Sequence, residues 1–221
     1  MNEYIDLDSL TRNTRRLEFE DGLNDFQNGL FFLILGLLSA VFMSTTGITW
    51  YMRAMMFNSE ITTIALLALI PLLYLLTFGV RRLIRRYRKN VLWHDLGEME
   101  PLKVQVDRRI SILATAVWLV IVIVGLIVLT GDPMDLAMRV IAGAGGIATG
   151  VIYVAMGQSL ALTRYRWVGI IGGFLSALLI VAPLSVSTGW LAVGLIWALT
   201  LWVSGSVALR STLMRLKANA S

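Results

Sequence analysis

The stretch from Ile61 to Asn90 reads "ITTIALLALIPLLYLLTFGVRRLIRRYRKN" and joins two opposite compositions. Its first twenty residues carry no charge, and its last ten hold six of the nineteen basic residues of the chain. About twenty apolar residues are enough for a helix to cross a hydrocarbon core of about 30 Å. The basic run then predicts the point at which this helix leaves the membrane.

The rest of the chain has the same segregated composition. Of its 221 residues 57% are hydrophobic and 15% are charged, and the mean hydropathy is +0.75. Soluble domains average about 45–50% apolar and about 25% charged residues. Because short charged stretches separate long uncharged runs, the pattern predicts an all-α, polytopic integral membrane protein. The absence of cysteine excludes disulfides, thiolate metal sites and cysteine nucleophiles.

Six runs are long enough to cross the membrane, with short turns between most of them. They are Phe26–Ile48, Ile61–Val80, Ile110–Thr130, Leu136–Gly157, Val168–Val186 and Trp190–Leu209. Residues 1–25 form an N-terminal segment, which is possible as an interfacial helix. Residues 26–209 form the membrane domain, which includes a long loop at 81–109, and residues 210–221 form the tail. Three spans on each side of the turn "GDPMD" leave open a division into two inverted halves.

The basic residues set the expected orientation. If the N-terminus is cytoplasmic, the cytoplasmic side holds three in residues 1–25, nine in 81–109, two at Arg164 and Arg166, and three in the tail. Only Arg53 and Arg139 then lie on the outer side. This asymmetry predicts that both termini are cytoplasmic. We expect the plasma membrane of a prokaryote.

The basic run has two interpretations that are compatible with each other. It consists of Arg81, Arg82, Arg85, Arg86, Arg88 and Lys89. As a topological anchor it holds the end of the second span on the cytoplasmic side. Clusters of this size next to a membrane also attract anionic lipid, or an acidic protein partner. Nucleic acid is not expected, since the run has one aromatic residue and no recognisable binding module around it.

Small residues recur every four positions in the fourth and fifth spans. The residues are Ala142, Gly146 and Gly150 in the fourth span and Gly169, Gly173 and Ala177 in the fifth. Small side chains let helix backbones approach closely in lipid. The pattern predicts that the two helices pack on each other within one subunit, with homo-oligomerisation as the alternative.

Charged residues near or within the membrane have expected partners. Glu18, Asp21 and Asp25 share one face if their segment is helical, and we expect them to pair with the basic run from Arg81 to Arg88. Arg139 lies inside the fourth span, where we expect a structural role with Asp135 at i−4. These carboxylates and the single histidine do not have the spacing of a metal site.

Two function classes remain after this reading, and neither requires a cofactor or catalysis. The first is a membrane subunit or scaffold that acts through a cytoplasmic protein partner. Its layout is loosely similar to six-span exporter permeases, although that family places short helices before its last span, where this chain has only "STG". The second is a small-solute transporter with its site between the two halves, in which Pro71 and Pro183 break helices and free carbonyls.

Overall fold

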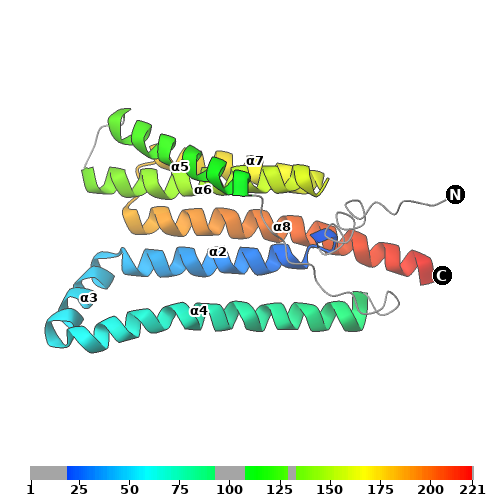
Figure 1. Cartoon of the computed structure of the whole chain (residues 1–221), viewed down its shortest axis with the longest axis horizontal. Coiled ribbons are helices and arrows are strands. Elements are labelled where there is room, and N and C mark those ends of the chain that lie inside the picture. The colour runs from blue at the N-terminus through cyan, green and yellow to red at the C-terminus, as the bar shows by residue number, and fades with distance from the viewer. Residues whose placement is uncertain (1–18, 93–107, 129–132, 221) are drawn as a thin grey trace.

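The protein folds as a bundle of long helices (Figure 1). The computed structural model describes residues 19–92, 108–128 and 133–220, and every regular element in these ranges is helical. The elements are α2 (Leu23–Phe42), α3 (Thr45–Phe57), α4 (Ser59–Tyr87), the π-helical turn η1 (Arg88–Leu92), α5 (Arg108–Val128), α6 (Pro133–Ser159), α7 (Thr163–Val181) and α8 (Val186–Ala220).

Five segments of the described chain are long and apolar enough to cross a membrane. They are Leu23–Phe42, Arg109–Ile127, Leu136–Ser159, Thr163–Val181 and Val186–Arg215. The prediction of a helical protein with several membrane helices is thus confirmed at this level. The remaining predicted span, Ile61–Val80, lies within α4 as continuous helix. Its membrane crossing, the total of six and the orientation stay predictions.

The first span ends earlier than predicted, at Phe42 instead of Ile48. Ser44 caps a new helix, α3, because its Oγ accepts a hydrogen bond from the Gly47 backbone N–H at 3.0 Å. A Cβ on Gly47 would collide with the carbonyl of Val41, so the tight α2–α3 turn requires glycine there. The predicted end of the first span was wrong because apolar composition continues past Phe42, whereas the Ser44 cap starts a new helix in another direction.

The fifth span was placed too far along the chain. Helix α7 begins at Thr163 and ends at Val181, and Pro183 lies in the turn that follows instead of inside the helix. Ala182 is extended, with ψ at 136°, as expected of a residue before proline. Helix α8 then starts at Val186 and runs to Ala220. Its 35 residues correspond to about 52 Å at 1.5 Å per residue, so α8 is longer than a bilayer core.

Proline does not interrupt α4. The helix continues through Pro71 from Ser59 to Tyr87, so the predicted break was wrong. Pro71 removes one N–H from the helix, and the hydrogen bonds on both sides of it are sufficient to keep the chain helical. Transport chemistry based on an unwound segment at this proline therefore has no support.

The helices pack in two tight pairs, α6 with α7 and α2 with α8. Helix α5 lies against α6, and α4 makes a lighter contact with α2 (Figure 1). The first three spans thus do not form a unit separate from the last three, because α2 belongs with α8 and α5 with α6. The division into two three-helix halves, which the sequence leaves open, is not seen in the described helices.

Small residues form the contact in both pairs. Gly150 lies so close to α7 that a Cβ would be 2.7 Å from the Gly169 carbonyl oxygen and 3.0 Å from the Gly173 Cα. A Cβ on Gly146 would collide with Ser176. The predicted glycines of α6 thus face α7 within one chain, Gly150 against Gly169 and Gly173, and Gly146 against Ser176. Between α2 and α8, a Cβ on Gly36 would lie 2.7 Å from the Cα of Gly194, a contact that the sequence reading missed.

One end of the bundle carries most of the described charge. The start of α2, the end of α4, the start of α7 and the end of α8 lie there, and α3 lies at the opposite end (Figure 1). We call it the basic end, after its exposed Arg81, Arg82, Arg85, Arg86, Lys89, Arg210, Arg215 and Lys217. Arg53 on α3 is exposed at the other end.

Candidate functional site

A fully buried carboxylate, Asp25, joins three helices near the basic end. Tyr165 of α7 donates its hydroxyl to Asp25 Oδ1 at 2.5 Å, and Ser204 of α8 donates to Oδ2 at 3.0 Å. Arg164 Nη1 lies 3.3 Å from the same Oδ2. A buried charge is stable only when it is paired and hydrogen-bonded, and Asp25 meets both conditions. The expected pairing of Asp25 with the basic run was wrong, since Arg164 supplies the positive charge.

The chain reaches this site through an irregular segment. Gly22 has a left-handed backbone, with φ at 77°, and a Cβ there would also lie 2.5 Å from the Gly205 carbonyl oxygen. Asp21 Oδ1 accepts a hydrogen bond from the Leu23 backbone N–H at 3.0 Å. The predicted continuous acidic helical face is therefore interrupted between Asp21 and Asp25. Glu18, its third member, lies outside the described residues.

Asp21 pairs with Arg88 from the basic run. Arg88 Nε donates to Asp21 Oδ2 at 2.6 Å, and Arg88 Nη2 donates to Oδ1 at 2.8 Å. A third donation reaches Asn24 Oδ1 at 3.3 Å. The side chains of Arg88 and Asp21 are 5% and 3% exposed, so this is a buried, two-pronged ion pair.

The basic run therefore has two kinds of member. Arg88 is turned inward to Asp21, and the prediction that it contacts lipid or a partner was wrong. The other five residues are exposed, and contact with lipid or a partner stays a prediction for them: Arg81, Arg82, Arg85, Arg86 and Lys89. Arg88 is the first residue of the π-helical turn η1, which follows α4.

An aromatic core lies next to the Asp25 site. Tyr153 of α6 packs edge-on against Tyr165 at 5.7 Å between ring centroids and stacks on Trp197 of α8 at 5.4 Å. Asn28 donates to the Tyr153 hydroxyl at 3.2 Å. Trp197 is fully buried in this core.

Arg139 lies at the opposite end of the bundle and has a backbone partner. Its Nη1 donates to the Ala182 carbonyl oxygen at 2.7 Å, at the C-terminal end of α7. A cation is favourable there because the last carbonyls of a helix carry partial negative charge. Arg139 thus links α6 to the α7–α8 turn.

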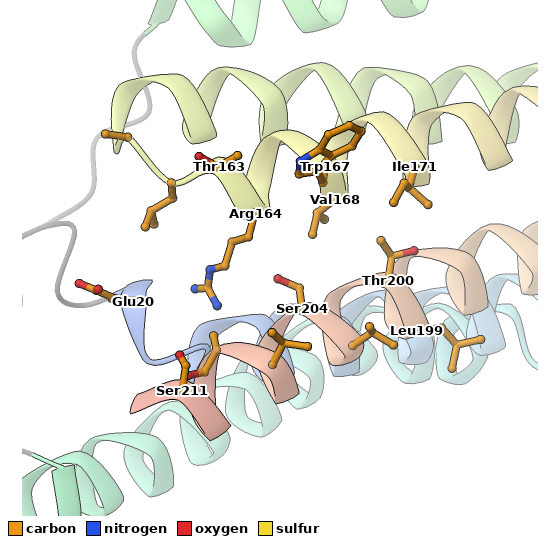
Figure 2. Close-up of a pocket in the computed structure, with 15 residues that line it drawn as sticks. Glu20, Thr163, Arg164, Trp167, Val168, Ile171, Leu199, Thr200, Ser204 and Ser211 are labelled. Carbon is orange, nitrogen blue, oxygen red and sulfur yellow. The ribbon is translucent and has the colours of Figure 1, made fainter. Parts of the chain in front are cut away.

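An open groove runs between α7 and α8, next to the Asp25 site (Figure 2). Its volume is about 730 Å³. The residues along it are Glu20, Ala161, Leu162, Thr163, Arg164, Trp167, Val168, Ile171, Leu199, Thr200, Val203, Ser204, Val207, Ala208 and Ser211. Arg164 extends from α7 across the gap, and Ser204 faces it from α8 (Figure 2).

Sequence reasoning missed Arg164, Tyr165 and Ser204 as partners of Asp25. A signal for Arg164 was available, because a carboxylate at the start of one apolar span needs a counter-charge at a similar depth. Arg164 is at the start of α7 and so meets this condition. Tyr165 and Ser204 carried no comparable signal, since hydroxyls are frequent in such helices.

Comparisons of the chain with protein-family models, with curated proteins and with solved structures give no match.

Proposed function

We propose that the protein is a membrane subunit that acts through a partner bound at its basic end. The observation that carries the proposal is that two helices from distant parts of the chain present exposed basic residues at one end of the bundle. Helix α4 contributes Arg81, Arg82, Arg85 and Arg86, and α8 contributes Arg210, Arg215 and Lys217. A surface of this sign is complementary to an acidic protein or to anionic lipid head groups.

The projecting part of α8 also has a groove that suits a protein partner. This groove has a volume of about 490 Å³ and is lined by Phe26, Ser206, Leu209, Arg210, Leu213, Met214 and Lys217. An apolar floor with basic residues at its rim fits an amphipathic helix that carries acidic side chains. The excess of basic residues supports a cytoplasmic location for this end, and therefore a cytoplasmic partner.

Small-solute transport at a site between two three-helix halves has less support. The described helices pair across the two halves, and the buried carboxylate Asp25 is already bound by Tyr165, Ser204 and Arg164. We keep transport as an outcome that the following experiment can reveal.

The test is purification from native membranes in a mild detergent with charge variants at the two ends. The quadruple variant Arg81→Gln, Arg82→Gln, Arg85→Gln, Arg86→Gln changes only exposed residues and leaves a large excess of basic residues on the same side. Arg53→Gln removes an exposed charge at the opposite end and is the control. We expect a stoichiometric protein partner with wild type and Arg53→Gln, and at least a tenfold loss with the quadruple variant.

Two results would contradict the proposal. In one, the partner is retained equally by all three proteins. In the other, each protein is a clean monomer that moves small solutes across vesicle membranes, which supports the transporter.

A further inference from the structure

The groove between α7 and α8 has the polarity profile of an amphiphile. Its volume of about 730 Å³ is within the range of small-molecule sites, which is about 300–1,000 Å³. Most of its wall is apolar, formed by Trp167, Val168, Ile171, Leu199, Val203 and Val207. Of the polar residues that line the groove, five lie toward the basic end, namely Glu20, Thr163, Arg164, Ser204 and Ser211, and Thr200 lies farther along, beside the apolar wall (Figure 2). The Thr200 hydroxyl donates to the Ile196 carbonyl oxygen of its own helix at 2.6 Å. An occupant therefore needs one polar end and a long apolar part.

Arg164 gives the polar end of the groove its preference for an anion. Its guanidinium spans the gap, donates from Nη2 to the Phe19 carbonyl oxygen and pairs with Asp25 through Nη1. Arg164 Nε is buried and has no hydrogen-bond acceptor among the described residues. Asp25 is also bound by Tyr165 and Ser204, and it is fully buried, whereas the Arg164 side chain remains 22% exposed. Glu20 also lines the groove, and its carboxylate is paired with Arg215 at 3.1 Å. Both carboxylates near the groove thus already have an arginine partner, and Arg164 supplies the hydrogen-bond donors that an anion in the groove would contact.

The walls of the groove argue against a transmembrane helix as the occupant. The tight helix contacts of this protein include glycine against glycine, with Gly150 on Gly169 between α6 and α7 and Gly36 on Gly194 between α2 and α8. No glycine lines this groove, and large side chains such as Trp167, Ile171 and Leu199 form its sides. Helices that pack in lipid need small residues to approach each other, and a flexible acyl chain does not.

We propose that this groove binds one glycerophospholipid, with its phosphate beside Arg164 and an acyl chain along Trp167, Ile171 and Val203. The phosphate lies where α7 begins, which is the depth expected of a head group. The first turn of α7 and the Thr163 hydroxyl add hydrogen-bond donors at that position. This site is distinct from the exposed basic residues of α4 and does not depend on a protein partner.

The test fills the groove with bulky side chains that leave the fold intact. Val203→Trp and Val207→Trp are suitable because these side chains line the groove and are 64% and 67% exposed. Phe174→Trp and Val181→Trp, at exposed positions of α7 outside the groove, are matched controls. Each protein is exchanged into vesicles of a phosphate-free, bilayer-forming galactolipid that contain a minor fraction of phosphatidylglycerol or of diacylglycerol. It is then solubilised and washed, and its retained lipid and oligomeric state are measured by native mass spectrometry.

We expect one retained phosphatidylglycerol per chain for wild type and both controls, and at least tenfold less for both groove variants, whose melting temperatures in lipid-free detergent should equal that of wild type. Diacylglycerol, which lacks the phosphate, should be retained at least tenfold less than phosphatidylglycerol, and inorganic phosphate at millimolar concentration should not displace the lipid. Equal retention by the groove and control variants would overturn the proposal. So would equal retention of the two lipids, displacement by inorganic phosphate, or a wild-type dimer that the groove variants dissociate, because the last result would identify a second copy as the occupant.

Discussion

The ion pair between Asp21 and Arg88 allows the sharpest test of the fold, because it connects α4 to the rest of the bundle. Helix α4 has only a light contact with α2. The pair makes two short hydrogen bonds, of 2.6 and 2.8 Å, between side chains that are 5% and 3% exposed. This pair should therefore contribute a large share of the free energy that keeps the end of α4 packed against the bundle.

Replacing Asp21 by Asn keeps the shape of the side chain and removes its charge. The buried Arg88 guanidinium then loses the negative charge of Asp21, and breaking a buried pair in this way costs about 3–5 kcal/mol. Asn24 still accepts a hydrogen bond from Arg88, so we expect the lower end, about 3 kcal/mol, which is roughly a hundredfold in the unfolding equilibrium. The double variant Asp21→Asn, Arg88→Gln removes both charges of the pair. Its loss of stability should therefore be smaller than the summed losses of the two single variants, by about 0.5–3 kcal/mol.

A second ion pair in the same region is a matched control. Glu20, next to Asp21 in the chain, accepts from Arg215 of α8 at 3.1 Å, but here the side chains are 31% and 72% exposed. Exposed pairs contribute about 0–1 kcal/mol, so Glu20→Gln should have little effect. The assay is equilibrium unfolding in mixed micelles, followed by circular dichroism. If Asp21→Asn and Glu20→Gln cost the same within about 0.5 kcal/mol, the burial argument is refuted.

Three further predictions concern the helix contacts, the orientation and the Asp25 site. Gly146→Ala should destabilise the protein by about 1–3 kcal/mol because its Cβ collides with Ser176. Gly145→Ala should not, since the nearest atom to its Cβ is 4.0 Å away, and equal melting temperatures of the two variants would contradict the α6–α7 contact. A cysteine at position 131 is the only thiol in the chain and should react with an impermeant reagent from outside, and protection there would contradict the predicted orientation. Tyr165→Phe leaves the buried Asp25 without one of its donors and should cost about 1–3 kcal/mol in the same micelle assay; an unchanged stability would show that this hydrogen bond is dispensable.

The helical class and the α6–α7 contact could be predicted from the sequence because both have a local period. Apolar runs of about twenty residues indicate membrane helices, and small residues four apart, such as Gly146 and Gly150, form one face. The α2–α8 contact had a weaker signal. Gly22, Gly29 and Gly36 are seven residues apart, which also gives one face every two turns, but four-residue spacing does not detect them.

The sequence indicates that Asp25 needs a counter-charge, but it does not single out Arg164, because the two residues are far apart in the sequence. Asp25 and Arg164 lie 139 positions apart, and several other arginines were expected at the same end of the bundle. The choice between Arg164 and the basic run depends on which helix packs beside α2, which composition does not determine. The break at Gly22 turns Asp21 toward Arg88 and Asp25 toward α7, so one local conformation decides both pairings.

The same packing explains why the groove and the polar site occur together. Helices α6 and α7 form one close pair, and α2 and α8 form another, but α7 and α8 touch each other much less. The two pairs are linked by the short turn after Ala182 at one end and by the Asp25 site at the other. Arg164 and Ser204 belong to both that site and the groove, so a ligand beside Arg164 contacts the residues that hold the pairs together.

A lipid that binds only the folded protein stabilises it, and the stabilisation grows with the logarithm of the ratio of lipid concentration to dissociation constant. Occupancy of the groove should therefore stabilise the junction between the two helix pairs.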